Sequence, residues 1–500
     1  MILNRRDVLK GAMAAGAAAA WPAAGRGAAP KAPGRPNILY ILVDQWRAQA
    51  TGYAGDPNVK TPNLDRLQSQ SVDFRNAVSV CPVCTPHRAA LLTGRYPTAT
   101  GMFLNDLYLP DDELCLAEIL QAGGYRTGYI GKWHLDGHGR KSFVAPPRRQ
   151  GWDYWKAAEC DHNYNHSHYY HGDSDQCRYW DGYDSYAQTR DAQAYLKARA
   201  GEDKPFALMI SHGTPHFPHH TAPKDLMAQY PPDKIQLRPN VPPEMQERAR
   251  KESCGYYAHC AALDKCLGDL METLEQTGLA KNTIVVFTSD HGEMMGSQGR
   301  PPCQKQTPWD ESIRVPFLLR LPAGADGKTA GRGVPAPINT PDILPTLLGL
   351  VGLSVPASVQ GEDLSALVRA AGGAADRAAL VMNVSPFGGN QKDKEFRGIR
   401  TARYSYIRSL EGPWLLYDNQ VDPCQMTNLA GRAEHAKIQD ELERQLQAEM
   451  KKHKVDFRPR QAYLDEWGYQ VTRSGIIGYG ETKGKVQSPG RKPQQQFRRR

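Results

Sequence analysis

The chain has 500 residues, of which 40% are hydrophobic and 23% charged, as in globular enzymes with two or three domains or one large α/β domain with an addition. Its formal net charge of +9 is raised by the ends, because residues 498–500 are all arginine. The other basic residues are scattered, so nucleic acid is not an expected partner. Ten cysteines spread over this length do not indicate a disulfide framework.

The N-terminus has the pattern of a twin-arginine export signal. Arg5 and Arg6 precede an alanine-rich stretch over residues 11–21, and small residues follow at which a peptidase could cut. The stretch is too short and too rich in alanine to predict stable membrane insertion. We therefore expect residues 1–33 to be an export signal and leader, and the protein to reach the periplasm or the extracellular space.

Apolar strands alternate with helices between residues 37 and 321. The predicted strands occupy residues 37–43, 125–130, 206–210, 283–288 and 315–321. The predicted helices occupy residues 61–67, 114–122, 186–200 and 244–276, and a further helix begins at residue 84. This alternation predicts an α/β fold, a doubly wound and mostly parallel sheet flanked by helices, over residues 34–375.

Six polar side chains come just after predicted strands. They are Asp44, Lys132, His134, His216, Asp290 and His291. Ligands of doubly wound sheets bind beyond the carboxyl ends of the strands. We therefore expect these side chains to converge at one edge of the sheet.

The sequence pattern changes near residue 378. Residues 397–408 alternate as an antiparallel strand pair would, residues 414–418 form another strand, and residues 434–452 form a final amphipathic helix. This predicts a smaller C-terminal domain, an antiparallel sheet plus a helix, over residues 376–483. Residues 484–500, rich in lysine, glutamine, proline and arginine, are expected to be disordered.

The most informative stretch begins at Cys84, which is followed by Pro86, Arg88 and an apolar helical turn. This order places the sulfur at a helix N-terminus, where free backbone N–H groups and the helix dipole favour negative charge. Two simpler interpretations stay open from the residues alone. In the first, Cys84 is a buried core cysteine. In the second, it forms a redox pair with Cys81.

The pattern Cys84-x-Pro86-x-Arg88, with its continuation through residue 95, resembles the signature of the type I sulfatases, members of the alkaline phosphatase superfamily. The resemblance covers roughly residues 36–430. In that family a formylglycine-generating enzyme oxidises the cysteine to formylglycine, whose hydrated aldehyde is the nucleophile. The resemblance therefore implies a sulfuric ester hydrolase that carries one divalent cation and formylglycine at position 84.

The resemblance also implies a set of metal ligands. They are Asp44, Gln45, the modified Cys84, Asp290 and His291. Gln45 stands where many members of the family have a second aspartate. One fewer negative charge should weaken cation binding, and Ca²⁺ is expected ahead of Mn²⁺ or Mg²⁺.

The remaining implied site residues act on the sulfuryl group. Arg88 would hold the nucleophile, while Lys132 and Lys305 would neutralise sulfate oxygens. His216 would protonate or hydrogen-bond the leaving oxygen. His134 would later take a proton from the second hydroxyl of the hydrated aldehyde, so that sulfate leaves.

Residues 161–171 are rich in asparagine, tyrosine and histidine, which suit hydrogen bonding to a sugar and stacking on it. A solvated surface loop and a second metal site are the alternatives for this stretch. Together with the export signal, this stretch favours a sulfated saccharide over a simple sulfated small molecule as substrate.

Two other functions stay open: hydrolysis of phosphate or phosphonate esters at the same site, and a non-catalytic binder or redox protein with unmodified Cys84.

Overall fold

The computed structural model describes residues 34–322, 331–370 and 376–478. The predicted leader (residues 1–33) and C-terminal tail (residues 484–500) lie outside the described residues. Within the described ranges, no helix has both the length and the apolar character needed to cross a membrane.

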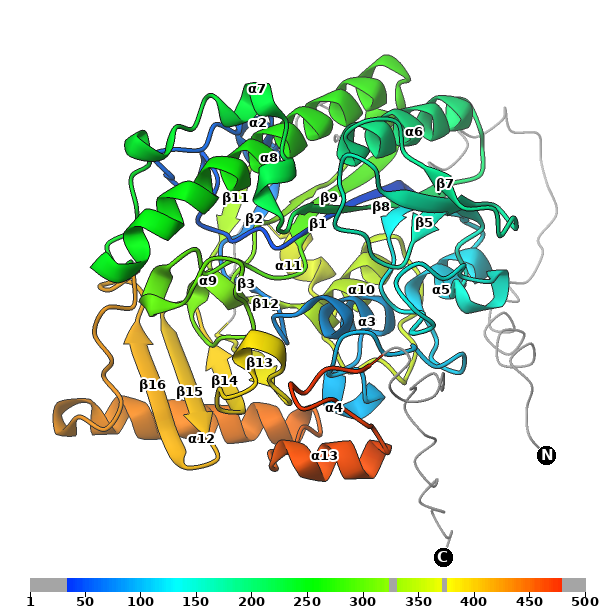
Figure 1. Cartoon of the computed structure of the whole chain (residues 1–500). Coiled ribbons are helices and arrows are strands. Elements are labelled where there is room, and N and C mark those ends of the chain that lie inside the picture. The colour runs from blue at the N-terminus through cyan, green and yellow to red at the C-terminus, as the bar shows by residue number, and fades with distance from the viewer. Residues whose placement is uncertain (1–33, 323–330, 371–375, 479–500) are drawn as a thin grey trace, which may run out of the picture.

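A large mixed sheet forms the centre of the molecule (Figure 1). Its strands are β1 (Asn37–Asp44), β2 (Val72–Phe74), β4 (Arg126–Lys132), β5 (Tyr154–Ala158), β6 (His168–His171), β7 (Arg178–Tyr179), β8 (Phe206–Pro215), β9 (Thr283–Ser289), β10 (Phe317–Arg320) and β11 (Arg332–Val334). They lie in the order β11-β2-β10-β9-β1-β8-β4-β5-β6-β7. The central strands β9, β1, β8, β4 and β5 are parallel, whereas β10 and β6 run antiparallel to their inner neighbours. The predicted mostly parallel sheet is thus confirmed.

Strand β1 is buried on both faces, as its continuous apolar sequence predicts. Its residues Ile38 and Leu42 belong to one cluster of buried side chains, whereas Leu39 and Val43 belong to another. Successive side chains of a strand point to opposite faces, so one strand contributes to two cores. Asp44 ends the strand between these cores, at the carboxyl edge of the sheet.

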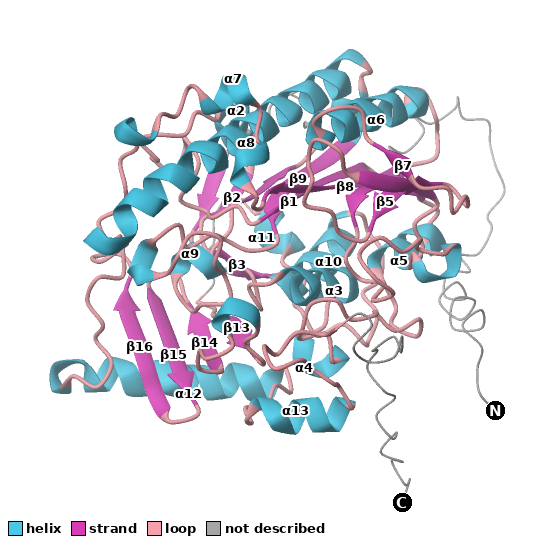
Figure 2. Ribbon diagram, viewed as in Figure 1, coloured by secondary structure: helices cyan, strands magenta, loops and turns pink. Residues whose placement is uncertain are grey.

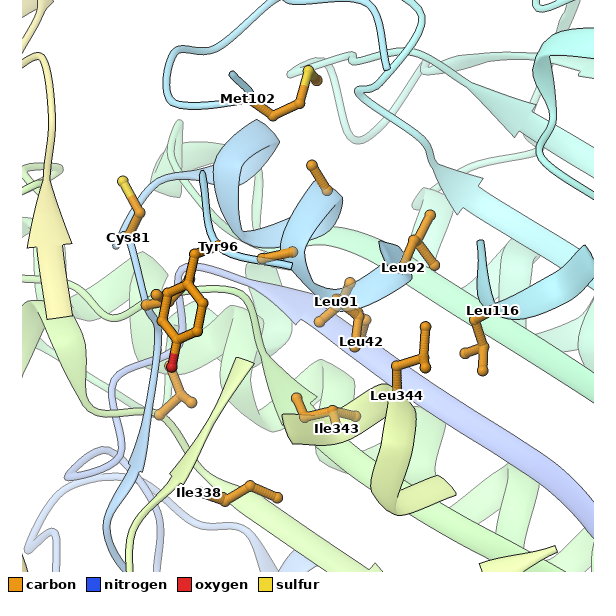
Figure 3. Close-up of a cluster of buried hydrophobic side chains, with 14 of the residues drawn as sticks. Leu42, Cys81, Leu91, Leu92, Tyr96, Met102, Leu116, Ile338, Ile343 and Leu344 are labelled. Carbon is orange, nitrogen blue, oxygen red and sulfur yellow. The ribbon is translucent and has the colours of Figure 1, made fainter. Parts of the chain in front are cut away.

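Helices cover both faces of the sheet, as Figure 2 shows. Beyond one face lie α2 (Pro62–Gln68), α6 (Asp184–Arg199), α7 (Lys224–Met227) and α8 (Pro243–Gln276). Beyond the other lie α3 (Cys84–Thr93), α5 (Leu116–Ala122), α10 (Thr340–Leu350) and α11 (Ser365–Arg369). Figure 3 shows Leu91 and Leu92 of α3 near Leu42 of the sheet and Leu344 of α10. Helices α3 and α10 therefore pack against each other beyond the same face of the sheet.

The C-terminal part forms a second, smaller sheet. Its antiparallel strands, in spatial order, are β13 (Ala379–Asn383), β14 (Phe396–Arg400), β15 (Tyr404–Ser409) and β16 (Gly412–Asp418). Helix α12 (Ala436–Lys452) contacts this sheet and buries Leu442 and Leu446. The predicted sheet and helix are confirmed, but α12 is not the final helix, because α13 (Arg460–Trp467) follows it.

The smaller sheet holds two segments of the larger part in place. Met382 donates a backbone hydrogen bond of 2.8 Å to the carbonyl of Val80, just before α3. The side chain of Asn383 donates a bond of 2.9 Å to the carbonyl of Gln306. The C-terminal sheet therefore fixes the chain that leads into α3 and the loop that carries Lys305.

Candidate active site

The predicted site residues converge at the carboxyl edge of the parallel strands. Asp44 ends β1, Lys132 ends β4, and Asp290 and His291 directly follow β9. His216 follows β8, the strand between β1 and β4. Residues far apart in sequence meet here because their strands are neighbours in one parallel sheet.

Cys84 lies at the first position of α3, and its sulfur is the point where several of these groups meet. The Sγ atom lies 3.3 Å from His291 Nε2, 3.5 Å from Lys305 Nζ and 3.7 Å from Asp44 Oδ1. Burial opposes ionisation of the thiol, yet the positive charges of Lys132 and Lys305 help to hold the pKa of Cys84 well below its usual value. The position thus stabilises a negatively charged or strongly polar group.

Cys81 has a different environment. It belongs to the cluster of buried hydrophobic side chains drawn in Figure 3. Burial raises the pKa of its thiol to about 12, so it is protonated at neutral pH. The two cysteines are not disulfide-bonded. A core cysteine with a raised pKa does not support the redox-pair interpretation.

Four predicted ligands form a compact, fully buried cluster that suits a cation. One ligand atom from each of Asp44, Cys84, Asp290 and His291 lies within 4.8 Å of every other. His291 Nδ1 bonds the Gly292 carbonyl, and Nε2 lies 3.5 Å from an oxygen of each carboxylate. Burial and the nearby Asp44 charge raise the pKa of Asp290. A bound divalent cation would relieve this repulsion between two buried carboxylates, so the donor set fits one.

Gln45, the fifth predicted ligand, has a left-handed backbone with φ of 69°. Its backbone N–H donates to Asp290 Oδ1 at 3.1 Å. Its side-chain oxygen accepts a bond of 2.9 Å from Lys305 Nζ, while its Nε2 donates to Glu293. The amide is therefore oriented from both sides, with its oxygen toward the lysine. Its role as a metal ligand stays a prediction.

The Arg88 guanidinium binds the carboxylates of the cluster. It contacts Asp44 Oδ2 at 3.3 Å and Asp290 Oδ2 at 3.1 Å. It also donates to the Lys132 carbonyl at 2.9 Å and to Ser211 Oγ at 2.7 Å. We expected Arg88 to hold the nucleophile, but its hydrogen bonds go to the two carboxylates. Its role toward the nucleophile stays a prediction.

Both lysines are bonded at the site. Lys132 Nζ lies 2.5 Å from Asp44 Oδ2, and burial of this pair is nearly complete. Lys305 Nζ lies between Gln45 and Cys84. Two ammonium groups next to residue 84 create positive potential where a sulfate group would bind.

In each of the two predicted histidines, one ring nitrogen is hydrogen-bonded to a neighbouring oxygen. His134 Nε2 lies 2.8 Å from Asp106 Oδ1, and its Nδ1 has no hydrogen-bond partner among the described residues. Burial alone would lower the pKa of His134, but charge on Cys160 and the hydrogen bond to Asp106 raise it to about 9. His216 Nδ1 bonds the Phe217 carbonyl at 2.7 Å, which leaves Nε2 as the outward nitrogen. Burial and the Lys305 charge hold the His216 pKa well below its usual value.

Part of the site lines a cavity of about 470 Å³, a size within the usual range of small-molecule sites of roughly 300–1,000 Å³; the site residues in its lining are Cys84, Lys132, His134, His216 and Lys305. Among the described residues that line it, none is an aspartate or glutamate. Its cationic lining residues are Lys132, Arg140, Arg248 and Lys305. The cavity is therefore suited to an anionic ligand.

The polar stretch over residues 161–171 contributes less to the cavity than we expected. His162 lines the cavity and stacks on His216, with 4.6 Å between the ring centroids. Tyr164 is buried and bonds the Gly213 carbonyl, and His168 bonds Asp161. Of this stretch, His162 is the one residue among those that line the cavity.

Two residues that orient the site were not predicted. Asp106 fixes the His134 ring, and Glu293 holds the Gln45 amide. Glu293 follows His291 by two residues, and this proximity was a usable signal. Asp106 comes from a loop that carries no motif of its own, so only the folded chain identifies it.

Comparison with known proteins agrees with this geometry. The sequence matches the family model described as Sulfatase over residues 36–353, and the model described as N-sulphoglucosamine sulphohydrolase, C-terminal, over residues 303–452. It is 52% identical over 461 residues to the "Ulvan-active sulfatase" of Formosa agariphila, which covers 91% of this chain and 90% of that protein. It is 34% identical to the "Endo-4-O-sulfatase" of Bacteroides thetaiotaomicron, over 79% of this chain and 88% of that protein.

A solved structure shares the fold as well. The Bacteroides fragilis protein yidJ superposes with a TM-score of 0.76 at 30% identity, covering 88% of this chain and 99% of that chain. The interpretation as a non-catalytic binder is thereby wrong. The chain belongs to the sulfatase family of the alkaline phosphatase superfamily, and it is a sulfuric ester hydrolase.

Proposed function

We propose that this sulfatase removes a sulfate ester from a saccharide, with formylglycine made from Cys84 as the nucleophile. The observation that carries the proposal is the position of the Cys84 sulfur, at a helix start and within 3.7 Å of Lys305, His291 and Asp44. The relatives named as an ulvan-active sulfatase and an endo-4-O-sulfatase support a saccharide substrate.

Asp44, Gln45, Asp290 and His291 are the residues that would hold a divalent cation, and Ca²⁺ is the ion we propose. The cation would supply positive charge and Lewis acidity at the nucleophile. Arg88 keeps both carboxylates in place through one guanidinium group. Oxygen donors dominate this set, which suits a hard cation.

Lys132 and Lys305 would bind the oxygens of the sulfuryl group as its charge is redistributed. His216 would donate a proton to the leaving oxygen through Nε2, because Nδ1–H is donated to the Phe217 carbonyl. Since burial and the Lys305 charge hold its pKa low, the negative charge of the bound sulfate ester would have to raise that pKa for the ring to carry this proton. His134 would accept a proton at Nδ1 in the second half of the reaction, a step that requires the neutral ring and is therefore favoured as the pH rises toward its pKa of about 9. The Asp106 carboxylate on Nε2 would stabilise the imidazolium that forms.

Maturation requires a formylglycine-generating enzyme as a partner. The Cys84 residue is only 1% exposed in the folded chain. We therefore propose that this enzyme acts on the segment before it folds. Export through the twin-arginine route, signalled by Arg5 and Arg6, would carry the modified, folded protein to the periplasm or beyond.

Parallel turnover assays test the proposed reaction. With mature enzyme, we expect release of inorganic sulfate from a sulfated oligosaccharide to exceed hydrolysis of a matched phosphonate or phosphate ester by at least about 100-fold, roughly 2.7 kcal/mol of transition-state discrimination. Mass spectrometry of the peptide that contains Cys84 reports whether the aldehyde is present in the same sample. Faster turnover of the phosphorus ester by aldehyde-bearing enzyme would contradict the proposal and favour the phosphonate alternative.

The two histidines should respond differently to the leaving group. We expect His216→Ala to reduce turnover of a saccharide sulfate by about 100-fold or more, but turnover of an activated aryl sulfate much less, since a phenolate needs little protonation. We expect His134→Ala to release at most about one equivalent of either leaving group and then stall. Rapid-quench measurement of the released alcohol or phenol checks both. Identical profiles for both variants would show that the two roles are misassigned.

A further inference from the structure

Arg248 is an exposed cation at the cavity that contains Cys84. It lies in α8, near the N-terminus of that helix, and it lines the same cavity as Lys132 and Lys305. In the part of the chain that the structure describes, its guanidinium makes no hydrogen bond or ion pair. Each of the two lysines, by contrast, is bonded to the site.

The carboxylates near Arg248 do not neutralise it at bonding distance. Glu252, one helical turn further along α8, bonds His219 Nδ1 at 2.8 Å instead. The Arg248 charge still contributes to a lowered pKa of Glu252, after the larger effect of the His219 hydrogen bond. Arg140, the other arginine of the cavity, contacts both oxygens of Asp106 at 3.2 and 3.3 Å. Among the four cationic lining residues, Arg248 is thus the one whose side chain has neither an ion pair nor a hydrogen bond to the described residues.

The same cavity is lined by Gln304, a polar residue whose side chain lacks a partner. The Gln304 side-chain oxygen is buried and has no hydrogen-bond partner in the described residues. Gln304 directly precedes Lys305 in the loop that lines the cavity. A buried, unpaired amide oxygen is unfavourable unless a ligand or water satisfies it. The cavity that Arg248 and Gln304 both line therefore has an unpaired cation and an unpaired acceptor.

We propose that Arg248 binds a second anionic group of the substrate, a carboxylate or a sulfate on the sugar unit next to the one that carries the scissile sulfate. This inference rests on the proposed saccharide substrate and specifies its class: a saccharide with at least two negative charges. A guanidinium is suited to this task because its planar N–H donors match two oxygens of a carboxylate or sulfate. In the proposed reaction Lys132 and Lys305 would be occupied by the scissile sulfate, so a second charge would need a separate cation.

The test compares Arg248→Gln with Lys251→Gln in mature, metal-loaded enzyme. Lys251 is an exposed cation on the same helix, and it does not line the cavity. Its substitution by glutamine removes one positive charge, as Arg248→Gln does. We expect Arg248→Gln to raise KM for a sulfated, uronate-containing oligosaccharide about tenfold with little change in kcat, and to leave kcat/KM for 4-nitrophenyl sulfate unchanged. Lys251→Gln should keep KM for the oligosaccharide and kcat/KM for 4-nitrophenyl sulfate within about twofold of the wild-type values. Arg248→Lys should have a KM for the oligosaccharide between those of wild type and Arg248→Gln.

The substrate series identifies the anion. If carboxyl reduction of the neighbouring sugar abolishes the difference between wild type and Arg248→Gln, the second anion is a carboxylate. If removal of a neighbouring sulfate does so instead, it is a sulfate. Equal KM values for wild type and Arg248→Gln on the intact oligosaccharide would overturn the inference. So would a loss of kcat/KM on 4-nitrophenyl sulfate as large as the loss on the oligosaccharide. A wild-type enzyme that cleaves the aryl sulfate but no saccharide would instead refute the proposed substrate, which is a separate outcome.

Discussion

Replacement of Cys84 by alanine is expected to lower turnover of any sulfate ester at least about 1,000-fold, because the variant lacks the side chain from which the nucleophile is made. The fold should persist, since the sulfur contacts the polar groups of the site. Turnover of aryl and saccharide sulfates, measured with thermal unfolding of the same samples, checks both expectations. Retained turnover in Cys84→Ala would refute the proposed mechanism.

Cys81→Ala is the matched control for this experiment. It removes a sulfur from a buried cysteine three residues earlier, which packs in a hydrophobic cluster rather than against charged groups. We expect this variant to keep most activity and to lose roughly 1–2 kcal/mol in free energy of unfolding, through lost packing. An equal loss of activity from both substitutions would restore the redox-pair interpretation.

Replacement of Asp290 by alanine should reduce turnover at least about 100-fold and remove the bound cation. Asp290 presents Oδ1 to the Gln45 N–H and Oδ2 to Arg88, so its loss removes a ligand and leaves the guanidinium with one carboxylate. Chelation of the wild-type enzyme should have the same effect, reversed by Ca²⁺. Metal analysis by mass spectrometry, alongside turnover after re-addition of Ca²⁺, Mg²⁺ or Mn²⁺, measures both.

A buried carboxylate outside the site supplies the control. Asp264 in α8 accepts hydrogen bonds from the backbone N–H groups of Asn63 and Leu64. Asp264→Asn should lower stability, because the amide is a poorer acceptor for these bonds, and should leave the metal content unchanged. Full activity of Asp290→Ala, or of wild-type protein that retains no metal, would contradict the proposed ligand set.

The sequence by itself determined the scaffold and most of the candidate site. The apolar runs that become β1 and β9 predicted strands buried on both faces, because in such a run both sets of alternating side chains are apolar. Asp44 and Asp290 could be assigned to one edge because each directly follows such a strand and the strands are parallel. Cys84 could be assigned to a helix start because its neighbours have the order of a helix N-terminus.

The tertiary structure alone decided which groups orient these residues. The loop that carries Asp106 and the turn that carries Glu293 have no periodic pattern, and their partners depend on how separate segments pack. The Arg88 guanidinium reaches the carboxylates because the N-terminus of α3 lies at the edge of the sheet where Asp44 and Asp290 stand. Long-range contacts of this kind depend on the conformation of whole connecting segments, which local sequence patterns do not specify. The place of Arg248 at the cavity, set by the path of α8 across the sheet, became visible for the same reason.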